Sequence, residues 1–412
     1  MRRREVLTGA VAAGLIGLAP RALAQALPEP TRRSRAALRV DALGMVDYER
    51  RPDGTLQLHP QIAQAARERR IDLTSMTIAE PGNGPNRFAE AVAAIAEWDQ
   101  AIAANPQVLR RIRNAADLRA AGDGRIGIIY NFQDTAALEG DAARVRLFKT
   151  LGVPVMQLTY NKRNLAGDGC LERANAGLSD FGRDVIAAMN AEHVLLDLSH
   201  AGQRTIAEGI AATKAPPAIT HSGCRALVDF PRNTYDAEMR ALAAKGGVFG
   251  LYLMPFLRPS GQPGREDLLR HLDHALNICG EDHIGIGTDQ YLRGRIVDDA
   301  ARKRQREFFE RRQRLGIAAP GEAADVLNHV DGYNDMARFD RIALDLSARG
   351  WSGARIDRLL GGNFARLFRE VWGSRTKTPR RSSRRGALLL AADPQGLSSA
   401  DTPPHPRRCR CR

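Results

Sequence analysis

The chain has 412 residues, of which 43% are hydrophobic, and a formal net charge of +14. This length is enough for one large α/β domain or for two ordinary domains. The charge is concentrated at the ends, because residues 1–24 carry four arginines against one glutamate and residues 374–412 carry ten basic residues against two acidic ones. The residues between them have a net charge of only +3, which argues against a nucleic-acid-binding core.

Residues 1–24, MRRREVLTGAVAAGLIGLAPRALA, predict an export signal. Arginines precede a short apolar stretch, and Ala22-Leu23-Ala24 is typical of a cleavage site. The pair Arg3-Arg4 is similar to the twin-arginine type of signal. Neither this stretch nor a later one reaches the roughly 20 apolar residues of a membrane-spanning helix. We therefore expect a mature protein that begins near Gln25 and is periplasmic or secreted in a bacterium, with an uncleaved anchor as the alternative.

Eight apolar, β-rich runs alternate with helical patterns between residues 25 and 373. The runs cover residues 39–45, 72–78, 125–132, 153–160, 193–199, 217–221, 248–254 and 283–289. The clearest helical patterns cover residues 88–105, 178–190, 205–215, 237–246 and 266–280. Eight strands that alternate with helices predict an α/β fold of the (β/α)8 TIM-barrel type, and a doubly wound open sheet is the structural alternative.

The C-terminal third of the chain contains two further predicted helices and then a tail of different composition. Residues 297–316 are typical of a charged surface helix, and residues 356–372 of an amphipathic helix that closes the domain. Residues 374–412 are rich in Pro, Ser and Arg and predict a disordered basic tail. The sequence thus predicts an export signal (1–24), one barrel domain (25–373) and a tail, which we interpret as a non-functional extension rather than a contact for lipid or nucleic acid.

The five cysteines are an odd number, so no disulfide framework can be derived from them. Cys170 and Cys224 both fall near the predicted carboxyl edge of the sheet. A disulfide between them is an open alternative in an oxidising compartment.

Polar side chains stand where several of the predicted strands end. Ligands bind beyond the carboxyl ends of strands in parallel α/β folds. The candidates in chain order are Gln133, Tyr160, His200, His221 and Asp289, while the first strand presents Leu43 and Met45. Histidine nitrogens suit zinc, and a carboxylate can hold a metal or take a proton from water. The joint pattern predicts a metal site, although each strand end taken alone could be ordinary.

A set of motifs resembles the membrane (renal) dipeptidases, which are zinc metallopeptidases of amidohydrolase-like barrel fold. The motifs are QLTYNKRN, GLSDFGRDVIAAMN, LLDLSHAGQRT, ITHSGCRAL, PRN, DHIGIGTD and LLGGNFARLFREVW, and the resemblance runs from about Val40 to Trp372. It implies that His200 and His221 ligate one zinc of a pair. It also implies that Arg232, followed by Asn233, binds the carboxylate of the substrate, and that Asp289 handles the proton of the attacking water.

The sequence departs from the family pattern at the other metal. The resemblance places a His-x-Asp pair where this chain has Leu43 and Met45, and a metal-bridging glutamate where it has Gln133. A further histidine of the family is replaced by Tyr160, whose phenol can still polarise a carbonyl group. We therefore expect one zinc ion on His200 and His221 with help from Gln133, Asp289 or water. Asp47 is a less favoured substitute ligand, since a surface charge is its expected role.

The resulting prediction is an exported metal-dependent dipeptidase that hydrolyses dipeptides or related small amides with one zinc ion. Asp289 and Tyr160 are the expected catalytic residues, and Arg232, Asn233 and Tyr160 the expected substrate-binding residues. The first alternative is a catalytically lapsed barrel that binds a peptide or small molecule, because two histidines alone make a weak zinc site. The second is a barrel that acts through its tail on the envelope or on nucleic acid. We expect a small substrate and no nucleic acid as partners, and a homodimer stays open.

Overall fold

The computed structural model describes residues 37–314 and 318–373. All of them belong to one compact unit. The predicted export signal (1–24) and basic tail (374–412) lie outside the described residues. The boundaries that the sequence suggests for the barrel domain therefore stay a prediction.

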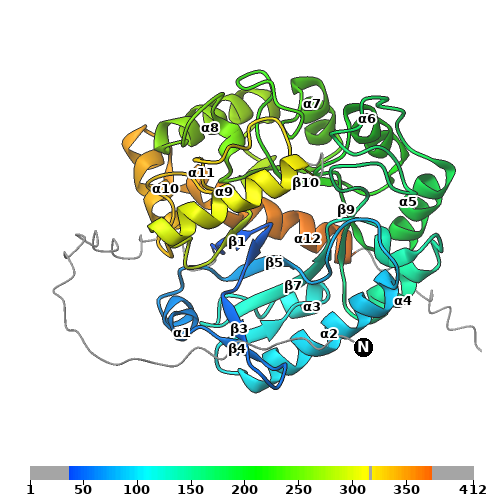
Figure 1. Cartoon of the computed structure of the whole chain (residues 1–412), viewed down its shortest axis with the longest axis horizontal. Helices are drawn as coiled ribbons and strands as arrows, with labels where there is room; N and C mark the ends of the chain where they lie inside the picture. Colours follow the sequence, from blue (N-terminus) through cyan, green and yellow to red (C-terminus); the bar gives the residue numbers. More distant parts are fainter. Residues whose placement is uncertain (1–36, 315–317, 374–412) are drawn as a thin grey trace, which may run out of the picture. The chain divides into compact units, whose positions relative to one another are not determined.

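Eight parallel strands form the wall of a barrel and follow one another in chain order (Figure 1). They are β1 (Val40–Asp41), β5 (Leu73–Thr77), β7 (Ile126–Phe132), β8 (Val155–Gln157), β9 (Leu195–Asp197), β10 (Ala218–Ser222), β11 (Val248–Leu251) and β12 (Ile284–Ile286). The last strand returns to the first, because the Ala42 N–H donates to the Ile286 carbonyl at 3.0 Å. The eight predicted strands and the (β/α)8 fold are confirmed, and the open-sheet alternative is wrong.

Further short strands lie beside the eight strands of the wall. β13 (Gln290–Tyr291) pairs in parallel with β2 (Gly44–Met45), which extends the closure toward the carboxyl edge. β6 (Leu109–Arg111) pairs with β7, and β3 (Tyr48–Arg50) forms an antiparallel hairpin with β4 (Leu56–Leu58). The hairpin was not predicted, because its strands are only three residues long and too short for a clear alternation.

Helices surround the barrel wall. Those before the last strand are α1 (Pro60–Arg67), α2 (Arg87–Ala104), α3 (Ala115–Leu118), η1 (Ala136–Leu138), α4 (Arg144–Thr150), α5 (Asp180–Glu192), α6 (Gln203–Ala212), α7 (Asp236–Ala244), η2 (Pro255–Leu257) and α8 (Arg265–Cys279). Those after it are α9 (Asp299–Arg314), α10 (Arg338–Ala348), α11 (Gly353–Asp357), η3 (Arg358–Gly362) and α12 (Asn363–Gly373). As predicted, α9 is a charged surface helix, and it has no buried residue. None of the helices in 37–314 and 318–373 is long and apolar enough to cross a membrane.

The closing helix is interrupted, whereas the sequence predicted one continuous amphipathic helix over 356–372. A π-helical turn, η3, separates α11 from α12 at Gly361. A Cβ on Gly361 would lie 2.0 Å from the Leu38 carbonyl oxygen. The helix is therefore interrupted at a position where only glycine, which has no Cβ, can lie so close to the backbone at the start of β1.

Helix α12 covers the amino-terminal end of the barrel. Its Phe364 and Phe368 are fully buried in one cluster with Val40, Leu73 and Val248 from the barrel strands. A Cβ on Gly285 of β12 would lie 2.4 Å from the Phe364 ring, so the ring packs directly on the strand backbone. This apolar plug closes one end of the barrel and leaves the carboxyl ends of the strands as the end where a ligand can enter.

Candidate active site

Two histidines meet at the carboxyl edge of neighbouring strands. His200 follows β9 and His221 lies within β10, and their Nε2 atoms are 2.9 Å apart. His200 is 5% exposed and His221 is fully buried. His200 has a φ of 60°, which is unusual for a residue other than glycine. Such strain persists where the surrounding structure enforces it and is common at functional sites.

Hydrogen bonds fix which nitrogen of each ring carries the proton. His200 Nδ1 lies 2.7 Å from the side-chain oxygen of Asn161, which can only accept, so Nδ1 of His200 is the donor. The Thr220 hydroxyl donates to Asp197 at 2.6 Å and therefore accepts from His221 Nδ1 at 2.8 Å. Both Nε2 atoms then carry a lone pair that points toward the other ring. Two lone pairs at this distance suit a shared cation. The hydrogen bonds made by the two Nδ1 atoms are of the kind that orient metal-binding histidines.

The charge state of the two rings agrees with this arrangement. Burial, and then the positive charge of Arg232, lower the pKa of His200 and of His221 well below the usual 6.5. Both imidazoles are therefore neutral near pH 7, which is the form that binds a metal.

Gln133 and Tyr160 lie against the histidine pair. The Gln133 amide nitrogen is 3.3 Å from His221 Nε2, and the Tyr160 ring stacks on the His200 ring with 4.2 Å between centroids. Burial and the charge of Asp289 raise the pKa of Tyr160 to about 12. Tyr160 is therefore a neutral phenol that can donate a hydrogen bond.

Asp289 stands in the short link between β12 and β13, immediately before β13, with a φ of 55°. Its backbone N–H donates to the Leu43 carbonyl at 2.8 Å, which ties the last strand to the first. Burial raises the pKa of the Asp289 carboxyl, while Arg232 and Arg295 act against this shift. A carboxylate in such a setting is a stronger base than an exposed one.

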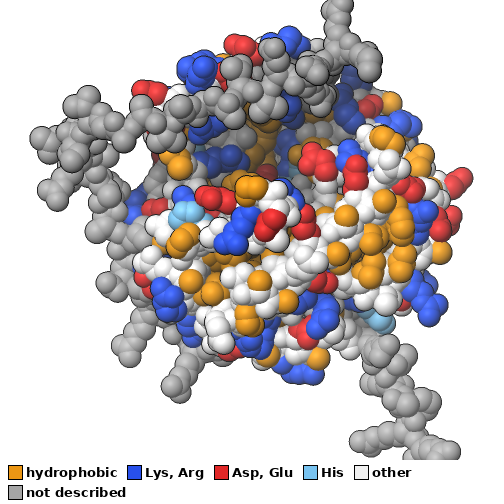
Figure 2. Space-filling model, turned by 60° about the horizontal axis from the view of Figure 1, so that its bottom comes forward, with side chains coloured by type: hydrophobic (Ala, Val, Ile, Leu, Met, Phe, Trp, Pro, Cys, Tyr) orange, Lys and Arg blue, Asp and Glu red, His pale blue; other side chains and the backbone are white. Residues whose placement is uncertain are grey.

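A cavity of about 390 Å³ lies over these side chains. The strand-end residues Leu43, Met45, Gln133, Tyr160 and Asp289 all line it. The two histidines do not line it, but each contacts a residue that does, His200 through Tyr160 and His221 through Gln133. From outside, one face of the molecule is hollowed, with basic side chains on the walls of the hollow and apolar ones deeper in (Figure 2).

The structure brings two nitrogen donors together at this site. His200 and His221 supply two nitrogen lone pairs, and Gln133 could add an amide oxygen after a rotation of its side chain. Leu43 and Met45 stand at the end of the first strand and offer no ligand that zinc favours. No group of three or more His, Cys, Asp or Glu side chains able to hold a metal occurs within residues 37–314 and 318–373.

Arg232 is 5% exposed and lies with its guanidinium 5.6 Å from the centre of the Tyr252 ring. No carboxylate of the described residues lies within ion-pair distance of it. The adjacent Asn233 is fully engaged: its amide nitrogen donates to the carbonyls of Val228 and Phe256, and its oxygen accepts from the Tyr252 hydroxyl. In this conformation Asn233 holds the loop that carries Arg232, and its contact with substrate stays a prediction.

Three further side chains differ from what the sequence suggested. Asp47 lines a neighbouring cavity and accepts from the Arg293 backbone N–H at 3.0 Å, so it does not join the histidines. Cys170 and Cys224 are free thiols, and the disulfide between them is absent. Cys224 Sγ instead lies 3.5 Å from the His271 carbonyl and Cys170 Sγ 3.5 Å from Asn161.

The residues that orient the histidines were not among those predicted from the sequence. Asn161, Asp197 and Thr220 fix the two tautomers. The one available signal was the polar pattern of Asp197-Leu198-Ser199 inside an otherwise apolar strand end.

The sequence is similar to those of known dipeptidases. The family model "Membrane dipeptidase (Peptidase family M19)" matches residues 44–299. An uncharacterized Klebsiella pneumoniae protein from the pqqA 5′ region is 27% identical over 66% of this chain and 93% of its own length. Dipeptidase tcpJ of Claviceps purpurea (strain 20.1) is 25% identical over 62% of this chain, which spans only 53% of that relative.

Solved structures share the fold. An amidohydrolase from Pseudomonas aeruginosa is 29% identical with a TM-score of 0.69, and covers 82% of this chain and 98% of its own. A metallo peptidase from Rhodobacter sphaeroides, liganded with a phosphinate mimic of the dipeptide L-Ala-D-Ala, is 21% identical with a TM-score of 0.62 over 78% and 92% of the two chains. The family model covers more than half of the sequence, and the chain belongs to the membrane dipeptidase family, peptidase family M19.

Proposed function

We propose that this protein hydrolyses dipeptides or related small amides with a single zinc ion held by His200 and His221. The observation that carries the proposal is the convergence of two neutral imidazoles, whose Nε2 lone pairs meet at 2.9 Å. The family supports a metal-dependent hydrolase, and the nitrogen donors favour zinc. A zinc ion bound there would act as a Lewis acid and lower the pKa of a water molecule.

The surrounding side chains supply the other parts of a hydrolase site. Asp289 lines the cavity with a raised pKa, which suits a group that takes the proton of the attacking water and later returns it. Tyr160 keeps its phenolic proton and can donate it in a hydrogen bond to the scissile carbonyl oxygen. Arg232, buried and without a carboxylate partner in the described part of the chain, suits the C-terminal carboxylate of a dipeptide, with Asn233 supporting the same loop.

A lapsed site that only binds a peptide or small molecule is the second candidate. The observation that favours it is the Gln133 amide, whose nitrogen faces His221 at 3.3 Å where an acidic metal ligand would be needed for a stronger site. Two imidazoles without an acidic third ligand bind zinc weakly. This candidate keeps the cavity and Arg232 but no hydrolysis.

Metal analysis and peptide hydrolysis on one sample separate the two candidates. We expect about one zinc per chain in protein purified without chelator, and turnover of a dipeptide panel. We expect the double variant His200→Ala/His221→Ala to lose both while its circular dichroism spectrum is unchanged. Unchanged zinc content in that variant would refute the ligand assignment. Zinc-free wild-type protein with no turnover after zinc addition, but with measurable dipeptide binding, would establish the second candidate.

Export to the periplasm and a boundary at residue 24 belong to the same proposal. Residues 1–24 lead a domain that extends to about residue 373, followed by a tail, residues 374–412. Replacement of both Arg3 and Arg4 by lysine is expected to keep the protein in the cytoplasm. Cell fractionation and N-terminal sequencing of the mature chain, with Gln25 expected first, test this. Sedimentation of the mature protein tests the open question of a homodimer.

A further inference from the structure

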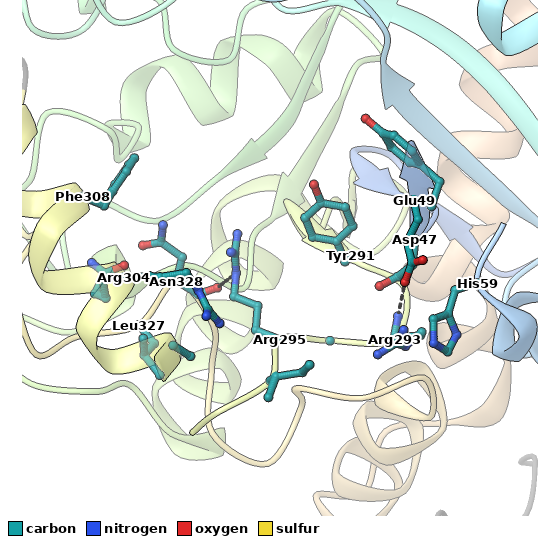
Figure 3. A pocket seen from close by; sticks show the side chains of 15 residues that line it. Asp47, Glu49, His59, Tyr291, Arg293, Arg295, Arg304, Phe308, Leu327 and Asn328 are labelled. Carbon is teal, nitrogen blue, oxygen red and sulfur yellow. Dashed lines mark hydrogen bonds between the residues drawn. The ribbon is translucent and has the colours of Figure 1, made fainter. Parts of the chain in front are cut away.

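A second cavity, of about 530 Å³, adjoins the first. Tyr48 and Tyr291 line both cavities, so the two share a wall at the mouth of the barrel. The remaining lining comes from hairpin strand β3, the loop after β13, helix α9 and the segment at Asn328 (Figure 3). None of these side chains is assigned to the metal, to catalysis or to the main-chain carboxylate of the substrate in the function proposed above.

The charges in this second cavity are separated. Asp47 and Glu49 lie with His59 and Arg293 at one end, while Arg295 and Arg304 lie at the other end with Asn328 (Figure 3). The Asp47 carboxylate is already engaged by the backbone N–H of Arg293. Neither Asp47 nor Glu49 forms an ion pair with Arg295 or Arg304. The positive charge at the end that holds the two arginines is therefore not neutralised by the acidic residues at the other end of the cavity.

Arg295 is held rigidly by its neighbours. Its Nε donates to the Asn328 carbonyl at 2.9 Å and to the Gln290 side-chain oxygen at 3.3 Å. Its backbone N–H and carbonyl both bond to the Asn334 amide, at 2.7 and 2.9 Å. The two terminal nitrogens of the guanidinium have no hydrogen-bond partner within the described residues. A fixed guanidinium with both terminal nitrogens free is the geometry that binds a carboxylate with two parallel hydrogen bonds.

Arg304 adds a second positive charge from another element. It projects from α9, and no acidic side chain of residues 37–314 or 318–373 lies within ion-pair distance of it. The Lys303 and Arg314 side chains of the same helix, by contrast, each have a glutamate partner one turn away. Arg304 is thus available to a negatively charged ligand in the cavity.

Arg295 also acts on the proposed catalytic carboxylate. Arg232 and Arg295 are the two basic side chains that lower the pKa of Asp289 against the effect of burial. Arg295 therefore lies near the reacting end of the first cavity while it lines the second. Because Arg232 is assigned to the main-chain carboxylate of the substrate, Arg295 is left for a second negative group.

We propose that Arg295 and Arg304 form an anion subsite that makes the protein selective for dipeptides with a carboxylate side chain, that is, for aspartyl or glutamyl dipeptides. This inference rests on the proposed function and specifies its substrate class. The hydrophobic ring of Phe308, which also lines the cavity, can cover the methylene groups of such a side chain.

Pairs of dipeptides that differ only in one charge test the subsite. We would measure kcat/KM of the zinc-loaded protein for Ala-Glu against Ala-Gln and for Glu-Ala against Gln-Ala. We expect one pair to favour the glutamyl peptide by about tenfold or more, as for a charge-assisted hydrogen bond. Arg295→Gln should lower that preference about tenfold, and Arg295→Lys should keep part of it because the charge remains.

Two further variants make the test robust. Arg304→Gln changes an exposed helix residue and is expected to fold normally and lower the preference about threefold. Arg369→Gln removes the same charge from the exposed face of α12 outside both cavities, and should leave the preference unchanged. Equal rates for both members of each pair in the wild type, or a preference that neither Arg295→Gln nor Arg304→Gln reduces, would overturn the subsite.

Calorimetric binding of the same peptides separates this inference from the proposed hydrolysis. Binding that favours the glutamyl peptide and loses this preference in Arg295→Gln would support the subsite even where no peptide is cleaved. Cleavage without any preference would leave the hydrolase proposal intact and refute the subsite. Neither cleavage nor preferential binding would refute both.

Discussion

The phenol ring of Tyr160 stacks on the imidazole of His200 with 4.2 Å between ring centroids and 24° between ring planes. The residue that replaces a histidine of the family pattern therefore lies directly against one of the two proposed metal ligands. The ring packs against His200, while the hydroxyl, with a pKa raised to about 12, keeps its proton at neutral pH. The ring and the hydroxyl of Tyr160 can thus be tested separately.

Tyr160→Phe keeps the stacked ring and removes the hydrogen-bond donor. We expect kcat for a dipeptide to fall roughly 10- to 100-fold while KM and zinc content stay near the wild-type values, because only the transition state loses a contact. Steady-state kinetics and elemental analysis of the same samples check this. Tyr235→Phe, on the segment before α7, serves as the matched control. A loss of zinc together with activity would mean that Tyr160 supports the metal site and does not act on the substrate.

Thr220→Val tests the bonds that orient His221. The valine has the same shape as threonine but neither accepts from His221 Nδ1 nor donates to Asp197. We expect zinc affinity to fall roughly 10- to 100-fold, as when other second bonds to metal-binding histidines are removed. Competition with a chromophoric chelator measures this. Thr150→Val, on the exposed end of α4, should leave the affinity unchanged, and an equal affinity in both variants would contradict the proposed tautomers.

Arg232→Ala tests recognition of the substrate carboxylate. Arg232 is buried and forms no ion pair within the described residues, although its charge lowers the pKa of the Asp289 carboxyl. Any effect of its removal through Asp289 should be shared by all substrates, so a comparison of two substrates isolates carboxylate recognition. We expect KM for a dipeptide to rise at least tenfold, and KM for the same dipeptide with a C-terminal amide to change far less. The amide is the internal control, and equal effects on both substrates would refute the role.

The raised pKa of Asp41 predicts that the stability of the fold depends on pH. It is buried beside Thr288, whose backbone N–H and hydroxyl both donate to it, and burial raises its pKa from 3.8 to about 7. Between pH 4 and 7 the folded state therefore binds one more proton than the unfolded state, so stability falls as the pH rises through this range. The loss amounts to about 4 kcal/mol over three pH units.

Asp41→Asn should flatten this dependence. The amide can still accept from the Thr288 N–H and has no proton to lose. Denaturant unfolding at pH 4.5 and pH 7.5 compares the two proteins, with Asp229→Asn, whose side chain is 80% exposed, as the control. A wild-type and an Asp41→Asn protein with the same pH dependence would show that Asp41 does not titrate in this range.

The local pattern of apolar and polar residues was sufficient to predict most of the fold. Eight apolar runs became eight barrel strands, because burial on both faces of a parallel strand requires a continuous apolar run that is visible in the sequence. Local pattern failed at Gly361, where the closing helix breaks, since the cause is the approach of Leu38 from the other end of the chain. It also failed for the three-residue strands of the β3–β4 hairpin.

The sequence by itself determined the barrel, the strand ends at which candidate side chains stand, and the departures at Leu43, Met45 and Gln133, because residue types and their period along a strand are local properties. Only the tertiary structure decided how those side chains meet. Asn161 reaches His200 across 39 positions, and Arg232, in the loop after β10, acts on Asp289, which follows β12. Distances, tautomers and pKa shifts arise from such contacts between distant segments, and no single segment of the sequence contains them.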